Sequence, residues 1–274
     1  MVTSSLLGPS SHAYATGGIY TITVTLTDDD TGIDVETTLA IITGVGIHTV
    51  DGEEVLQIIG TSGADQISVN RTGNGQLKVH ASFLPEDERS FDLADVDRLF
   101  AILCEGDDHM TVSGHVTVAA MIDAGGGADH VNGGGGSDVI LGRGGDDNLN
   151  GGTGRDILIG GSGIDRIVGG PNQDIITGAA LPDAGATLDS ILDDADDLLI
   201  AQRNWNVDEP IDDRKDELEV YFSSLVDDLV ADHLTGSEGD DWFRLFAGDI
   251  QTAEKSRGDS DEKAGGNNGK GKGK

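Results

Sequence analysis

Residues 124–177 consist of six nonapeptides that follow one another without a gap. They read AGGGADHVN, GGGGSDVIL, GRGGDDNLN, GGTGRDILI, GGSGIDRIV and GGPNQDIIT. Each has an aspartate at its sixth place and an aliphatic residue at its eighth, and glycine recurs at the first, second and fourth places. A short period repeated this strictly predicts a solenoid, in which each unit packs only against its neighbours.

The pattern inside one repeat predicts a tight turn followed by a very short strand. Glycine allows the positive φ values that tight turns need, and the last three residues alternate so that one aliphatic side chain points inward. Two repeats would form one coil of a right-handed parallel β-roll, with coils about 4.8 Å apart. We therefore expect an all-β-dominated fold, with a short helical insertion or cap near the C-terminus.

Coiling at two repeats per turn brings the sixth-place aspartates of one side close together. Two carboxylates about 4 Å apart repel by roughly 4 kcal/mol at an effective dielectric constant of about 20, and a divalent cation reverses this repulsion. Calcium accepts both carboxylate and carbonyl oxygens, whereas magnesium needs a tighter octahedron and keeps its water. The array thus predicts calcium ligands at Asp129, Asp138, Asp147, Asp156, Asp165 and Asp174.

Six buried aliphatic side chains are too few to order a glycine-rich segment of this length by themselves. We therefore expect calcium binding and folding of the array to be one event.

The array resembles the RTX (repeats-in-toxin, hemolysin-type) calcium-binding family, whose repeat is GGxGxDxUx. The resemblance implies a β-roll that holds calcium between turns two repeats apart. Carried over, it pairs Asp129 with Asp147, Asp138 with Asp156, Asp147 with Asp165, and Asp156 with Asp174, which makes about four complete sites. Three residues depart from the pattern, namely Ala124, Arg143 and Asn172.

Residues 1–45 contain two alternating segments, 20–27 and 35–43, separated by the turn sequence DDDTG. The stretch SSHAYATGGIYTITVTLTDDDTG resembles the end of a PKD domain, an immunoglobulin-like sandwich common in surface proteins. The alternative is a free-standing hairpin that precedes the solenoid.

Residues 46–123 are predicted to form a degenerate solenoid or a small β domain, with strands at 55–59, 66–70, 76–83, 97–103 and 115–122. Two segments in this region, GTSGADQIS and LCEGDDHMT, echo the repeat and place Asp65 and Asp108 at the sixth position. These two residues are either calcium ligands or relics that only form turns.

Residues 178–250 interrupt the pattern with apolar residues at helical spacing. One helix is expected to begin near Thr187 and a second to span 213–232, and together they would cap the open end of the roll. The segment GSEGDDWFR restores the repeat and adds Asp241 to the expected calcium ligands. Residues 251–274 are of low complexity and are expected to be disordered.

The net charge of −33 disfavours nucleic acid and anionic membranes as partners and favours cations. The sequence contains no apolar stretch long enough for a membrane helix and no secretory signal peptide, so export would use another signal or the chain is a fragment. The single cysteine excludes an internal disulfide.

No catalytic motif of a zinc protease, serine hydrolase or nucleotide-binding enzyme occurs in the chain, so we expect no enzyme activity. The first hypothesis is an extracellular calcium-binding structural module of a larger secreted or surface protein. Two alternatives are an adhesion or carbohydrate-binding module with a cell-surface or extracellular polymer partner, and the targeting end of an exported toxin or hydrolase.

Overall fold

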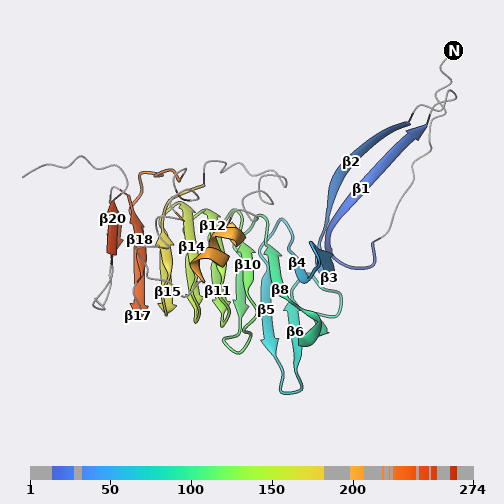
Figure 1. Cartoon of the computed structure of the whole chain (residues 1–274), viewed down its shortest axis with the longest axis horizontal. Coiled ribbons are helices and arrows are strands. Elements are labelled where there is room, and N and C mark those ends of the chain that lie inside the picture. The colour runs from blue at the N-terminus through green and yellow to red at the C-terminus, as the bar shows by residue number, and fades with distance from the viewer. Residues whose placement is uncertain are drawn as a thin grey trace, which may run out of the picture.

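The computed structural model describes residues 14–27, 33–181, 198–206, 225–238, 241–246, 248–251 and 260–263, together with Leu218 and Phe222. These residues form two nine-stranded sheets and a separate two-stranded sheet. Figure 1 shows the strands of the two large sheets as one long stack, with the hairpin β1–β2 projecting at the N-terminal end. The expected all-β roll is confirmed.

One large sheet, here called the covered sheet, has the order β20-β18-β16-β14-β12-β10-β8-β4-β3. Its strands are β3 (Gly44–Val50), β4 (Glu53–Ile59), β8 (Arg98–Ile102), β10 (Ala120–Asp123), β12 (Val139–Gly144), β14 (Ile157–Ser162), β16 (Ile175–Thr177), β18 (Trp242–Leu245) and β20 (Ser260–Lys263). From β4 to β20 all neighbours are parallel, and β3 adds an antiparallel edge.

The other large sheet, here called the open sheet, has the order β19-β17-β15-β13-β11-β9-β5-β6-β7. Its strands are β5 (Gln66–Arg71), β6 (Gln76–Ala81), β7 (Glu88–Asp92), β9 (His109–Val112), β11 (His130–Gly134), β13 (Asn148–Gly152), β15 (Arg166–Pro171), β17 (His233–Glu238) and β19 (Ile250–Gln251). A short 3₁₀ helix, Leu93–Asp95, follows β7.

The chain alternates between the two sheets, so that one strand of each makes a coil. Val131 pairs with Leu149 in the open sheet, and Ile140 pairs with Leu158 in the covered sheet. Both pairings join residues two nonapeptides apart, which confirms that two repeats make one coil.

Eighth-place side chains from both sheets fill the space between them. They include Met110, Val131, Ile140, Leu149, Leu158, Ile167, Ile176, Leu234 and Phe243, all fully buried. These two rows of apolar residues, one from each sheet, form the centre of the core of the roll.

The outward faces of the two sheets differ because the repeats alternate in kind. Repeats that enter the covered sheet end in VIL, ILI and IIT, and their seventh-place residues Val139, Ile157 and Ile175 are buried. Repeats that enter the open sheet end in HVN, NLN and RIV, and their outward residues are exposed or half-buried. The covered sheet therefore needs a second layer.

The insertion after β16 supplies that layer. Helical residues 198–205 and the helical positions Leu218 and Phe222 bury Leu198, Ala201 and Trp205 against the outer face of the covered sheet. Figure 1 shows the helical segment in front of the stack, alongside β10 to β14. The expected cap at the end of the roll is therefore wrong: the helical segment covers a face, because the apolar surface is on that face.

The second expected helix does not extend to residue 232. Ala180 and Val226 form an antiparallel bridge with two backbone hydrogen bonds of 2.9 Å, and Leu229 has a left-handed φ of 68°. This bridge closes the insertion and returns the chain to β17. The helix start expected at Thr187 lies outside the described residues.

Residues 46–123 combine both expected forms: β4, β8 and β10 pair in parallel in the covered sheet and β5 and β9 in the open sheet, while β3, β6 and β7 add antiparallel edge strands. The strands expected at 55–59, 66–70, 76–83 and 97–103 are present with small shifts in their ends, but the one expected at 115–122 is replaced by β9 and β10. A turn in which the Val116 N–H donates to the Ser113 carbonyl separates them.

The strands β1 (Gly18–Thr27) and β2 (Ile33–Ile42) pair only with each other, as in the free-standing hairpin alternative. At the other end, β20 lies within the tail expected to be disordered and pairs with β18. The rest of the tail beyond residue 263 lies outside the described residues.

The three departures from the repeat are accommodated. Arg143 and Asn172 occupy glycine places with φ values of 73° and 86°. The Arg143 guanidinium also donates to Asp123 Oδ2 at 2.8 and 3.0 Å. Ala124 is fully buried.

Candidate metal centre

A first ladder of aspartates follows the turns that enter the open sheet. We call each aspartate of a ladder a rung. In each step the backbone N–H of one rung donates to Oδ1 of the rung one coil further on. The steps join Asp65, Asp108, Asp129, Asp147, Asp165, Asp232 and Asp249, at donor–acceptor distances of 2.6, 2.7, 2.8, 3.0, 2.8 and 3.4 Å.

A second ladder follows the turns that enter the covered sheet. It begins where the Ala120 N–H donates to Asp138 Oδ1 at 2.7 Å and then joins Asp138, Asp156, Asp174 and Asp241 at 2.8, 2.9 and 3.0 Å. All seven aspartates expected as calcium ligands from the sequence thus lie in one of the two ladders.

Most ladder carboxylates use one oxygen in the ladder and leave the other without a partner. Within the described part of the chain, Oδ2 is buried and has no hydrogen-bond partner in seven of these residues, Asp108, Asp129, Asp138, Asp147, Asp156, Asp165 and Asp174. A buried carboxylate oxygen without a partner is costly, particularly when the group is charged. A row of such oxygens indicates a missing cationic or protonated partner.

The first-place glycine of each repeat makes room for that oxygen. A Cβ built on Gly133 would lie 2.6 Å from Asp138 Oδ2 and 2.7 Å from the Gly151 carbonyl oxygen. These distances are shorter than real Cβ atoms allow. The carboxylate and the carbonyl of the next coil therefore meet in a space that any side chain would fill.

Burial raises the pKa of the ladder carboxylates. The pKa rises from 3.8 to about 6 for Asp108 and Asp165, about 7 for Asp129, Asp156 and Asp232, about 8 for Asp147 and about 10 for Asp174. The backbone N–H donors work against burial, while the charge of adjacent rungs adds to it for Asp147 and Asp174. Without a cation, the folded ladders therefore keep protons at a higher pH than free aspartates do, and Asp147 and Asp174 keep them through neutral pH.

Asp65 differs from the other rungs because its own turn satisfies it. Its Oδ2 accepts from the Thr61 N–H at 2.7 Å and the Thr61 hydroxyl at 3.1 Å, and its Oδ1 accepts from the Ser82 hydroxyl at 3.2 Å. These contacts favour the turn-forming role over a calcium ligand. Asp108, by contrast, has the buried and unpaired Oδ2 of an array residue.

Sequence reasoning missed two rungs, Asp232 and Asp249. The segment ADHLT resembles the end of a repeat and was the available signal for Asp232. Asp249 comes eight rather than nine residues after Asp241, so the period does not reveal it. Asp249 Oδ1 makes the longest step of the ladder, 3.4 Å.

Within the described residues, no three His, Cys, Asp or Glu side chains gather closely enough to hold a metal ion. A cation between two rungs would therefore take only two carboxylates and would depend on main-chain carbonyl oxygens. That all-oxygen donor set, with buried orphaned oxygens, suits calcium rather than zinc or copper. No helix in this same part of the chain is long and apolar enough to cross a membrane.

Comparison with known proteins agrees with this geometry. A family model described as the RTX calcium-binding nonapeptide repeat (4 copies) matches residues 123–158, 150–180 and 230–249. The third segment contains Asp232 and Asp241, on the far side of the insertion. No curated protein and no solved structure matches the chain.

The matched segments are similar to RTX calcium-binding repeats, and such repeats imply calcium binding in a β-roll. This repeat is a structural calcium-binding module and not a catalytic one. The PKD resemblance of residues 1–45 finds no support in the comparisons.

Proposed function

We propose that the chain is an extracellular calcium-binding module that becomes a rigid rod when calcium occupies its aspartate ladders. The ligands would come from Asp129, Asp138, Asp147, Asp156, Asp165, Asp174 and Asp241, as expected from the sequence. Asp108 and Asp232 would extend the first ladder beyond the array. The observation that carries this proposal is the row of buried carboxylate oxygens without partners.

The residues of the chain prepare the site in three ways. The backbone N–H of each rung holds one carboxylate oxygen of the next rung at 2.6–3.4 Å and so fixes its direction. The first-place glycine leaves space beside the other oxygen inside the turn. The eighth-place aliphatics pack between the sheets and hold the coils together. Bound calcium would supply the positive charge that lets adjacent rungs ionise together.

Folding and calcium binding would be coupled because the same contacts serve both. Stacked turns bring ionised carboxylates together only at a cost, and that cost disappears when a cation lies between them. Cells keep free calcium low, and extracellular modules bind it at about 10⁻⁴–10⁻³ M. The ladders would thus stay loose inside a cell and close after export, which suits a structural part of a larger secreted or surface protein.

The test is a calcium titration of the chelated full chain, followed by far-UV circular dichroism and by calorimetry. We expect strand content to rise cooperatively with calcium over about 0.1–1 mM, the range of extracellular calcium modules, and to rise much less with equal magnesium. A chelated chain that stays compact and protease-resistant, or a spectrum that calcium does not change, would refute the proposal.

A further inference from the structure

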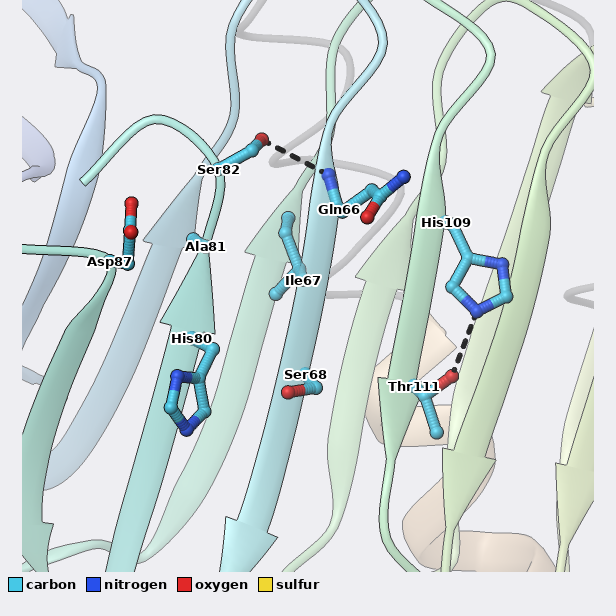
Figure 2. A pocket seen from close by; sticks show the side chains of 9 residues that line it. All are labelled: Gln66, Ile67, Ser68, His80, Ala81, Ser82, Asp87, His109 and Thr111. Atoms are coloured by element: carbon cyan, nitrogen blue, oxygen red, sulfur yellow. Dashed lines mark hydrogen bonds between the residues drawn. The ribbon is translucent and has the colours of Figure 1, made fainter.

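The outer face of the open sheet is hollowed near its N-terminal end, beside the start of the first ladder. A groove of about 550 Å³ crosses β6, β5 and β9, lined by Gln66, Ser68, His80, Ser82, Asp87, His109 and Thr111 above the buried Ile67 and Ala81. Figure 2 shows these side chains on adjacent strands, with the segment after β6 bordering the groove. Its volume is within the range of small-molecule sites.

Strand register arranges the polar groups of the groove in two rows. In one row, Ser68 pairs with His80 on one side and with Thr111 on the other. In the other row, Gln66 pairs with His109, and its backbone N–H donates to the Ser82 hydroxyl at 3.1 Å. Since neighbouring strands lie about 4.8 Å apart, the rows present a regular grid of hydrogen-bonding groups.

Several of these groups keep hydrogen-bonding capacity for a ligand. Ser68 Oγ accepts from Asn70 Nδ2 at 3.2 Å, so its hydroxyl proton is still available to donate. Among the described residues, the side-chain amide of Gln66, which is exposed, makes no hydrogen bond. The groove therefore offers both donors and acceptors, as a hydroxyl-rich ligand requires.

The His109 ring adds a flat surface to one wall of the groove. It stacks on the ring of His130, with centroids 4.7 Å apart and planes within 2° of parallel. His130, on the neighbouring strand β11, covers one face of the His109 ring. The opposite face can contact the C–H groups of a ring-shaped ligand.

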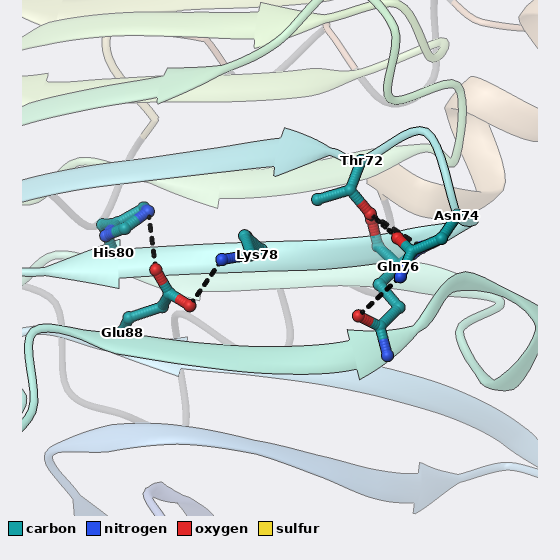
Figure 3. Close-up of polar contacts among 6 residues, drawn as sticks. All are labelled: Thr72, Asn74, Gln76, Lys78, His80 and Glu88. Atoms are coloured by element: carbon teal, nitrogen blue, oxygen red, sulfur yellow. Dashed lines mark hydrogen bonds and ion pairs between the residues drawn. The ribbon is translucent and has the colours of Figure 1, made fainter.

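The opposite wall is held in place by an ion pair at its rim. Glu88 lies 2.7 Å from Lys78 Nζ and 3.3 Å from His80 Nε2. Figure 3 shows Glu88 reaching from β7 to both side chains on β6. The His80 ring is thus oriented before any ligand arrives.

The charges of the groove select against anions. Among the residues that line it, Asp87 is the only one with a fixed charge and none is a lysine or arginine, and the chain has a net charge of −33, so an anion would be repelled. His80 and His109 lie on strands two apart, a separation of about 9.6 Å, which is too far for both to bind one metal ion. Because most of the lining side chains are uncharged hydrogen-bonding groups, the groove fits a neutral ligand.

We propose that this groove binds a neutral, polyhydroxylated ligand, a segment of an uncharged oligosaccharide. The rows of Gln66, Ser68 and Thr111 would bond its hydroxyl groups, and His109 would contact a sugar face. The groove uses none of the ladder carboxylates themselves, so binding here would give the rod a point of attachment to a glycan surface.

The experiment titrates the calcium-loaded full chain with cellohexaose and with N-acetylchitohexaose, by calorimetry and by amide chemical-shift mapping. Hexagalacturonate serves as the charged comparison. We expect millimolar or tighter saturable binding of at least one neutral hexasaccharide, with shifts centred on β5 and β9. The double variant Gln66→Ala/His109→Ala should weaken binding roughly tenfold, as loss of about one hydrogen bond would.

A matched control variant lies on the same outward face beyond the groove, Asn148→Ala/Arg166→Ala, and should leave the affinity unchanged. Calcium-dependent circular dichroism of each variant reports the roll separately, so that a loss of sugar binding with an intact calcium response locates the effect in the groove. No saturable binding of either neutral hexasaccharide, stronger binding of hexagalacturonate, or equal effects of the two double variants would overturn the proposal.

Discussion

Replacing Asp156 by asparagine should change stability in opposite directions with and without calcium. Asp156 is fully buried, and its Oδ1 accepts the Asp138 N–H at 2.8 Å. An asparagine of the same shape keeps that acceptor but removes the negative charge. If the ladder is a row of charges that needs a cation, the substitution should stabilise the chelated protein against unfolding and destabilise the calcium-loaded protein.

The gain in stability of the calcium-free variant can be estimated from the pKa of Asp156. Burial raises the pKa of Asp156 from 3.8 to about 7, and each pKa unit corresponds to about 1.36 kcal/mol. Ionised Asp156 thus costs the folded, calcium-free state at most about 4 kcal/mol above pH 7. Asp138 is coupled to it and can hold a shared proton, so we expect Asp156→Asn to stabilise by roughly 2–4 kcal/mol.

The assay is urea unfolding followed by circular dichroism near pH 8, where Asp156 is ionised. The calcium-loaded protein is measured directly, and we expect Asp156→Asn to lower its free energy of unfolding by at least about 1 kcal/mol through the loss of a charged ligand. The chelated protein is measured in graded trimethylamine oxide, an osmolyte that favours the folded state. The same variant should need less osmolyte to fold.

The control is Asp146→Asn, an exposed fifth-place aspartate whose Oδ1 accepts the Ile164 N–H at 2.9 Å. It should change either free energy by no more than about 0.5 kcal/mol. Destabilisation of the chelated protein by Asp156→Asn, or equal behaviour of the two variants, would show that the ladder is not strained by charge.

Three further predictions concern the same ladders. Because the raised pKa values make the folded state bind more protons, the chelated protein should lose stability as pH rises from about 4 to 8, and a flat or rising profile in osmolyte titrations would contradict this. Gly133→Ala should lower the free energy of unfolding measured in urea by about 1–3 kcal/mol, because the added Cβ crowds Asp138. Gly114→Ala, whose Cβ meets nothing within 4 Å, should leave it unchanged. Calorimetry should show Asp156→Ala lowering calcium stoichiometry more than Asp65→Ala does; equal losses would make Asp65 a ligand.

The parts of the structure that follow a local period could be read from the sequence. A turn, a three-residue strand and an inward aliphatic recur every nine residues, and stacking then requires residues 18 apart to pair, as Asp129 and Asp147 do. The left-handed place of Asn172 also follows from its position in the repeat. These features depend on neighbours in sequence and on the adjacent coil alone.

The packing position of the insertion was not predicted correctly, although the sequence contained a signal for it. The alternation of VIL and ILI with HVN and NLN marks one sheet as apolar on both faces, and helices placed at the end of the roll would have left that face in water. Trp205 and Phe222 are buried against it. The insertion covers this face because doing so buries apolar surface, and the periodicity within the helices does not indicate which face is covered.

The repeat by itself determined the roll, its two-repeat coil and the side-by-side aspartates, because each depends on backbone geometry over one or two periods. The restored repeat also pointed to Asp241, but only the tertiary structure decided that Asp232 and Asp249 continue the first ladder and that both ladders stay in register across the insertion. Asp165 bonds to Asp232 and Asp174 to Asp241, each across 67 residues. The chain can rejoin in register after so long an excursion because the insertion packs on the covered sheet and closes through the Ala180–Val226 bridge, and no local pattern encodes that return.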